Sequence, residues 1–176
     1  MKENSSPARK TALIGVLAAA AIAASLLERA FCAALPLPPG VRPGFSNVVV
    51  LFACSALGLP YALGITVLKA GAALLTAGPT AGVLSLAGGV CSVCGAAVLL
   101  RFGKKLSYAG VSVVGATLHN AAQLITVSLL TGTGAYWTLA PVLLLAGVGF
   151  GLFTGMILNA VMPALLRLFP FIKKGR

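Results

Sequence analysis

The sequence predicts an all-α integral membrane protein with six transmembrane helices, and composition and length carry the prediction. Of 176 residues, 59% are hydrophobic and only 9% are charged, and the mean hydropathy is +1.04. Soluble domains have about 25% charged residues, so lipid is the natural solvent here. A hydrocarbon core of about 30 Å takes roughly 20 helical residues to cross, so the chain fits five to seven spans. We therefore expect residues 1–176 to form a single transmembrane domain.

The first predicted helix covers residues 11–27 and follows a polar, basic segment of ten residues. Its apolar run is longer than the core of about 7–15 residues that signal peptides have. Glu28 and Arg29 follow it in place of a small-x-small cleavage site. We therefore predict a cytoplasmic tail over residues 1–10 and a retained first helix.

Prolines and glycines divide the next part of the chain. Four prolines within residues 30–44 exclude a continuous helix there, because proline lacks the N–H donor and clashes with the preceding turn. A short second helix is predicted over residues 45–57, and Gly58 and Pro60 end it. The third is predicted over residues 61–76, before a Gly-Pro pair.

The last three helices are predicted over residues 82–100, 107–130 and 137–160. A basic loop separates the helix at 82–100 from the helix at 107–130, and a Thr-Gly-Thr-Gly turn separates the latter from the helix at 137–160. Residues 163–176 mix leucine, phenylalanine and isoleucine with lysine and arginine, a composition typical of a basic interfacial tail.

The lysines and arginines predict the orientation. They cluster in residues 1–10, in the loop 101–105 and in the C-terminal tail. If all three segments face the cytoplasm, only Arg29 and Arg42 remain on the other side, with Lys69 inside the membrane. Six spans of the plasma membrane with both termini cytoplasmic give this asymmetry. The formal net charge of +11 is thereby explained by topology, and we expect no nucleic-acid partner.

Small residues spaced four apart predict close helix contacts. One such stripe lies in the sixth helix, and two overlapping ones lie in the first. Their members are Gly147, Gly151 and Gly155 in the sixth helix, and Ala19, Ala20, Ala23 and Ala24 in the first. Internal packing explains both sets. The stripe on the first helix could equally face a partner protein.

Polar residues at membrane depth are the candidates for function. Lys69 lies near the middle of the third helix, and His119 lies near the middle of the fifth, so their depths are similar. His119 shares a helical face with Gln123. An ionisable side chain at this depth costs several kcal/mol unless it meets a cavity or a partner. The alternative is an interhelical hydrogen-bond network that holds no ligand.

We predict a substrate-binding pocket in the outer half of the membrane. Its expected residues are Lys69, His119, Asn120, Gln123, Asn47, Glu28 and Arg42. Lys69 has a structural alternative, which is to pair with Glu28, the only acidic residue outside the N-terminal tail. The expected position of Glu28 near the outer end of the first helix counts against that pair. A buried cation without a fixed counter-charge is costly, which favours a ligand with an anionic or strongly hydrogen-bonding group.

Catalytic and metal-binding groups are scarce. Glu3 and Glu28 are the only acidic residues, and there is one histidine, so a carboxylate pair, a Mg²⁺ site and a Ser-His-Asp triad are all excluded. Cys91 and Cys94 have metal-ligand spacing, but they lie in an apolar helix without a second ligand pair. The sequence predicts neither an enzyme nor a cofactor.

Three segments together carry a family resemblance. They are PLPPGVRPGFSN at residues 36–47, LSLAGG at residues 84–89 and GVSVVGATLHNAAQ at residues 110–123. The combination resembles the Gx transporter family, also labelled heptaprenyl diphosphate synthase component I. It is similar to the substrate-binding S components of energy-coupling factor transporters. The resemblance covers nearly the whole chain, and its motifs are moderately specific.

The resemblance implies a six-helix, S-component-like bundle whose first helix docks on a transmembrane coupling protein driven by ATPases. It leaves two functions open. One is a substrate-capture subunit for uptake of a small metabolite, and the other is a non-catalytic membrane accessory or scaffold of an isoprenoid, quinone or redox assembly. An enclosed pocket around Lys69 and His119 would favour transport, whereas tight packing there would favour a scaffold.

Overall fold

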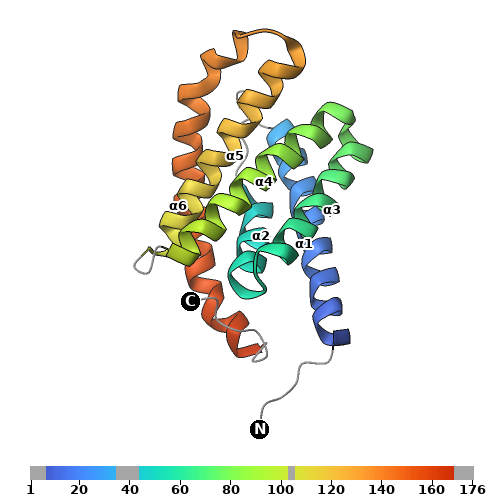
Figure 1. Cartoon of the computed structure of the whole chain (residues 1–176), viewed down its shortest axis with the longest axis vertical. Helices are drawn as coiled ribbons and strands as arrows, with labels where there is room; N and C mark the ends of the chain where they lie inside the picture. The colour runs from blue at the N-terminus through green and yellow to red at the C-terminus, as the bar shows by residue number, and fades with distance from the viewer. Residues whose placement is uncertain (1–6, 35–43, 103–105, 169–176) are drawn as a thin grey trace.

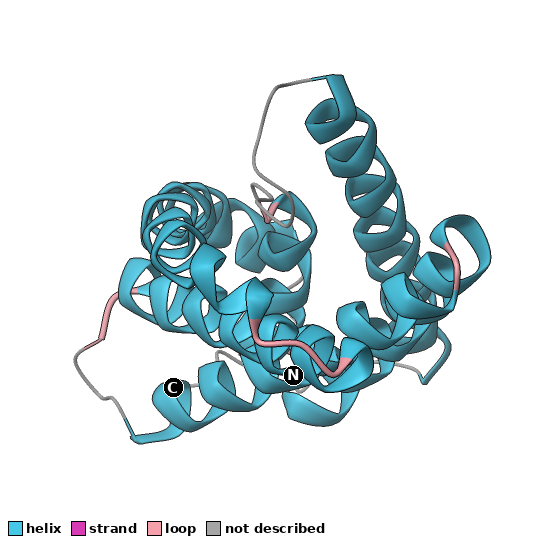
Figure 2. Cartoon of the chain, turned by 90° about the horizontal axis from the view of Figure 1, so that it is seen from above, coloured by secondary structure: helices cyan, strands magenta, loops and turns pink. Residues whose placement is uncertain are grey.

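The computed structural model describes residues 7–34, 44–102 and 106–168, and this part of the chain is helical with short loops and no strand (Figure 2). Six α-helices and one 3-10 helix form a single bundle (Figure 1). They are α1 (Pro7–Ala34), α2 (Phe45–Ala56), α3 (Leu59–Ala77), α4 (Pro79–Phe102), α5 (Tyr108–Thr131), η1 (Ala135–Leu139) and α6 (Ala140–Leu168). The prediction of an all-α membrane protein with six helices is confirmed.

Helix α2 differs from the others in length and position. The other five α-helices are long and apolar enough to cross a membrane, α6 together with η1, whereas α2 has 12 residues. At about 1.5 Å per residue it is roughly 18 Å long, well short of the hydrocarbon core. Its residues 50–56 are all buried, and it contacts each of the other five α-helices. The second part of α2 is therefore enclosed by the other helices, so α2 does not depend on a span's length to bury its apolar residues.

Helices α1 and α6 extend seven and eight residues beyond their predicted ends at residues 27 and 160. Helix α1 continues past Glu28 and Arg29 to Ala34, and α6 continues through Pro163 to Leu168. Residues 163–168 are therefore helical, and the interfacial location of residues 163–176 stays a prediction. A proline removes one backbone hydrogen bond, and neighbouring groups in membrane helices can compensate for that loss. Residues 1–6 and 169–176 of the two predicted tails lie outside the described residues.

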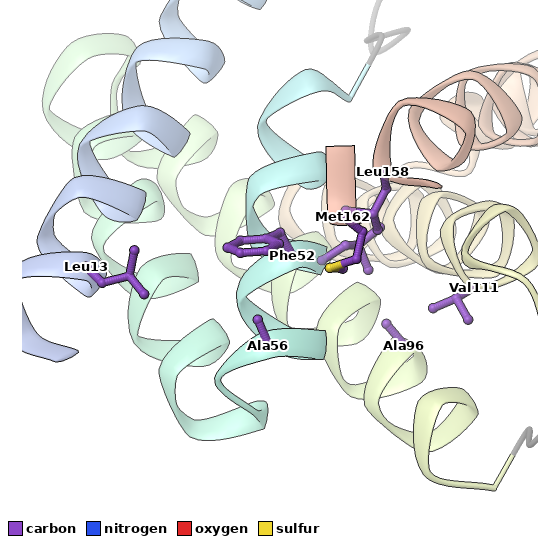
Figure 3. Packing of buried hydrophobic residues seen from close by; sticks show 8 residues of the cluster. Leu13, Phe52, Ala56, Ala96, Val111, Leu158 and Met162 are labelled. Atoms are coloured by element: carbon purple, nitrogen blue, oxygen red, sulfur yellow. The ribbon is translucent and has the colours of Figure 1, made fainter. Parts of the chain in front are cut away.

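An apolar cluster packs between α1, α2, α4, α5 and α6 (Figure 3). Phe52 and Ala56 of α2 lie at its centre, between Leu13 near the start of α1 and Met162 near the end of α6. The other members are Leu51, Ala96, Val111 and Leu158. In Figure 1, the start of α1, the end of α4, the start of α5 and the end of α6 all lie in the lower half of the view. The described chain thus begins and ends at the same end of the bundle.

Glycines allow α5 and α6 to approach closely. A Cβ atom added to Gly151 would lie 2.6 Å from the Cα atom of Val113, and one added to Gly155 would overlap the Cα atom of Ala109. Both glycines are buried. The Gly147–Gly151–Gly155 stripe therefore packs internally, as one of the two readings of the sequence expected.

Candidate functional site

A polar pocket adjoins the apolar cluster, and Leu51 belongs to both. All six α-helices line it, and its cavity volume is about 40 Å³. The pocket is lined by Glu28 near the end of α1 and by Asn47 near the start of α2. The cluster residues Leu13 and Ala56 lie toward the opposite ends of these two helices. The polar side chains that line it are Ser25, Glu28, Ser46, Asn47, Lys69, Ser85, Ser92, Ser112, His119, Asn120, Gln123 and Thr154.

Lys69 and Glu28 meet at the hydroxyl of Ser46. The Ser46 Oγ donates to Glu28 Oε2 at 3.0 Å and accepts from Lys69 Nζ at 3.3 Å. Lys69 also donates to Asn47 Oδ1 at 3.3 Å. The Lys69 and Glu28 side chains are buried, with 4% and 3% of their surfaces exposed. This network joins α1, α2 and α3 through charged and polar groups.

The structure brings Glu28 and Lys69 to one serine hydroxyl, so that Ser46 lies between the two groups whose pairing the sequence left open. Helix α1 runs six residues past Glu28, or about 9 Å at 1.5 Å per residue, so Glu28 lies inside the helix and not at its outer end. The two formal charges then share one hydroxyl. Lys69 therefore has a nearby counter-charge, which removes the main reason to expect an anionic ligand.

The predicted polar residues of α5 face the same pocket. Asn120 Nδ2 donates to the backbone oxygen of Leu143 in α6 at 2.6 Å. On the opposite side, a Cβ added to Gly88 of α4 would lie 2.9 Å from His119 Cε1 and 3.0 Å from Gln123 Cγ. His119 and Gln123 thus share a face, as their spacing predicts, and Gly88 leaves the space that they occupy.

Buried hydroxyl groups complete the lining, and the sequence reasoning missed most of them. Ser112 Oγ and Thr154 Oγ1 lie 2.7 Å apart across the α5–α6 contact. Ser85 and Ser92 are buried in α4, seven residues apart and therefore on one helical face. The seven-residue spacing of these serines, with Gly88 and Gly89 between them, is the sequence feature that could have indicated a polar face on α4. Serine is ordinary in membrane helices, so the signal is weak.

The predicted docking residues lie away from the pocket. Ala19, Ala20 and Ala23 are exposed on the surface of α1, and Ala24 is half-buried. Ala21, by contrast, is fully buried. The four alanines therefore leave most of their face open within the described bundle. Arg42 lies outside the described residues.

Metal-ligand groups do not gather within the described part of the chain. No set of three or more histidine, cysteine, aspartate or glutamate side chains there could hold a metal ion. Cys91 is exposed, Cys94 is half-buried, and both are free thiols.

Comparison with known proteins gives one family. No curated protein matches the chain. No solved structure matches it either. The model of the family described as heptaprenyl diphosphate synthase component I matches residues 17–175, nearly the whole chain. With this match over almost its full length, the chain belongs to the heptaprenyl diphosphate synthase component I family.

Proposed function

We propose that the chain is the substrate-binding subunit of a membrane transporter and captures a small polar metabolite in the pocket around Lys69 and His119. The observation that carries the proposal is a polar pocket lined from all six described α-helices, five of which are long and apolar enough to cross a membrane. Ionisable side chains within membrane segments are costly, and they commonly mark substrate or ion pathways. Six buried hydroxyls and three amides offer further hydrogen bonds there.

The condition of Glu28 favours a ligand over a purely structural network. In a network without a ligand, the buried polar atoms would be expected to satisfy one another. Glu28 Oε1 is buried and has no hydrogen-bond partner among the described residues. A scaffold binds its partners through its outer surface, so it does not require a polar pocket that contains an unpartnered carboxylate oxygen.

The second candidate is a non-catalytic membrane accessory, for which the family description is the supporting observation. The family description, heptaprenyl diphosphate synthase component I, implies that the synthase has at least one other subunit. A chain of this kind would anchor or assist the catalytic subunit. The described residues offer no carboxylate cluster for Mg²⁺ and diphosphate.

The transport proposal includes an orientation and a partner. With both termini in the cytoplasm of a plasma-membrane protein, the pocket would lie in the outer half of the membrane and receive substrate from outside. The exposed alanines of α1 would dock on a transmembrane coupling protein that ATPases drive, since small residues let helix backbones approach closely. This arrangement is that of an S component.

Native mass spectrometry of the gently purified chain tests the proposal. We expect the wild type to retain a small molecule, and we expect Lys69→Met to lose it while inserting and folding normally. Methionine removes the charge but keeps most of the apolar stem. Arg101→Met is the matched control, because Arg101 is exposed and outside the pocket. No retained molecule and no uptake in wild-type vesicles would favour the accessory role.

A further inference from the structure

Glu28 is a buried carboxylate of which only one oxygen is occupied. Its side chain is 97% buried, as 3% of the surface is exposed, and it lines the pocket. Oε2 accepts a hydrogen bond from Ser46, whereas Oε1 has no partner within the described part of the chain. The second oxygen is therefore a buried acceptor without a hydrogen-bond partner, on a side chain that lines the pocket.

An ionised carboxylate can only accept hydrogen bonds, so the group opposite Oε1 must be a donor. A buried acceptor left unmatched costs about 1–3 kcal/mol, and more when it is charged. A protonated nitrogen is the strongest match, because its hydrogen bond is charge-assisted and its charge opposes that of the carboxylate. A neutral donor can make the hydrogen bond but does not neutralise the charge of the carboxylate.

Lys69 is engaged with other atoms near the same carboxylate. Its ammonium donates to Ser46 Oγ and to Asn47 Oδ1, both at 3.3 Å. Ser46 in turn uses its proton on Oε2. Ser46 therefore links Lys69 to Oε2, and Oε1 has no hydrogen-bond partner within the described part of the chain.

We propose that the pocket binds a ligand with a protonated nitrogen, and that this nitrogen donates to Glu28 Oε1. The proposal deepens the transport function and rests on it, by naming the substrate class as amines and zwitterions. In a zwitterion, the anionic end would face Lys69, His119 or Asn120 on the other walls of the cavity.

The cavity limits what can bind in this conformation. A water molecule needs about 10–15 Å³ of such volume, so about 40 Å³ holds roughly three. A methylammonium ion, with two heavy atoms, fits this space. Drug-sized ligands occupy about 300–1,000 Å³, so a larger amine enters only if the helices separate.

Methylammonium is therefore the probe for the test. The full-length chain in lipid nanodiscs would be titrated with radiolabelled methylammonium at constant ionic strength. Unlabelled methylammonium, acetamide and sodium acetate would be the competitors. We expect saturable binding that only the unlabelled amine displaces. Glu28→Gln, which is nearly isosteric and still accepts from Ser46, should bind at least about tenfold more weakly. Arg101→Met should bind like the wild type.

Each outcome decides the proposal. Absence of saturable amine binding to the wild type, displacement by acetamide or acetate as efficient as by the amine, or unchanged binding in folded Glu28→Gln would overturn it. If Glu28→Gln does not fold, the competition on the wild type alone decides. A retained acidic or neutral metabolite without amine binding would overturn the amine assignment and leave transport standing. Absence of any retained molecule and of uptake would count against transport itself.

Discussion

Lys69 and Glu28, which the sequence places 41 residues apart, bind the same hydroxyl group of Ser46. Glu28 lies in α1, Ser46 in α2 and Lys69 in α3, so one serine joins three helices at the pocket. Because both charged side chains are buried, each depends on nearby polar groups to replace its lost hydration. Ser46 therefore links the stability of the bundle to the chemistry of the site.

Ser46→Ala should destabilise the protein by about 1–3 kcal/mol, because the change leaves Glu28 Oε2 and one Lys69 proton without their partner. Reversible unfolding in mixed micelles measures the loss. Thr76→Ala is the control, since Thr76 is an exposed hydroxyl that bonds only the Ala72 oxygen of its own helix. Equal effects of the two changes would show that the Ser46 link contributes nothing special.

Gly88→Ala should weaken ligand retention while the fold persists. The added methyl group would lie 2.9 Å from His119 Cε1 and 3.0 Å from Gln123 Cγ, so both side chains must shift. Gly64→Ala in α3 is the matched control, because a Cβ there meets nothing within 4 Å. Native mass spectrometry measures retention in both. If Gly88→Ala keeps its ligand as well as Gly64→Ala does, His119 and Gln123 do not form part of the site.

Gly151→Ala should destabilise the bundle by about 1–3 kcal/mol, as overpacking of a tight contact does. Its methyl group would lie 2.6 Å from the Cα atom of Val113, and backbone cannot move aside as a flexible side chain does. Gly149→Ala in the same helix is the control, because open space surrounds that position. Unfolding in micelles compares them, and equal stability would contradict a close α5–α6 approach.

The helices were predictable from the sequence because apolar runs alternate with prolines and glycines. The ends of α1 and α6 were not. Glu28 and Arg29 resembled the end of a span, but Glu28 finds a donor in Ser46 and the helix continues. Pro163 resembled a helix stop, but α6 passes through it. In both cases tertiary surroundings override a local signal.

The pocket was predictable in part. Helix depth places Lys69 and His119 at one level without any knowledge of packing, and the structure places both against the same cavity. The hydroxyl groups could not be selected, because most serines and threonines of membrane helices bond only their own backbone, as Thr66 does to Ala62. Which serine joins Glu28 to Lys69 depends on how three helices cross, and no local pattern encodes that. The binding roles of these residues remain predictions.

Cysteines placed at the two ends of α5 should be labelled from opposite sides of the membrane. Ser107 and Thr133 flank the helix and are both exposed, and 24 residues span about 36 Å. In a background free of native cysteines, we expect Ser107→Cys to react only when an impermeant maleimide reaches the cytoplasmic face. Thr133→Cys should react from outside in intact cells. The reverse pattern would invert the proposed topology, and labelling of both from one side would exclude it.

Ala23→Leu should abolish co-purification of the coupling partner without loss of the folded monomer. Ala23 is exposed on α1, so a larger side chain there leaves the internal packing intact but blocks close approach of another helix. Ala21→Leu is the contrasting variant, because Ala21 is fully buried and leucine has no room there. Affinity purification from native membranes, followed by size-exclusion chromatography of the chain alone, separates the two effects. We expect Ala23→Leu to lose only the partner and Ala21→Leu to lose the fold. A partner that remains bound to Ala23→Leu must dock elsewhere, whereas a misfolded Ala23→Leu monomer would mean that this face of α1 packs within the bundle.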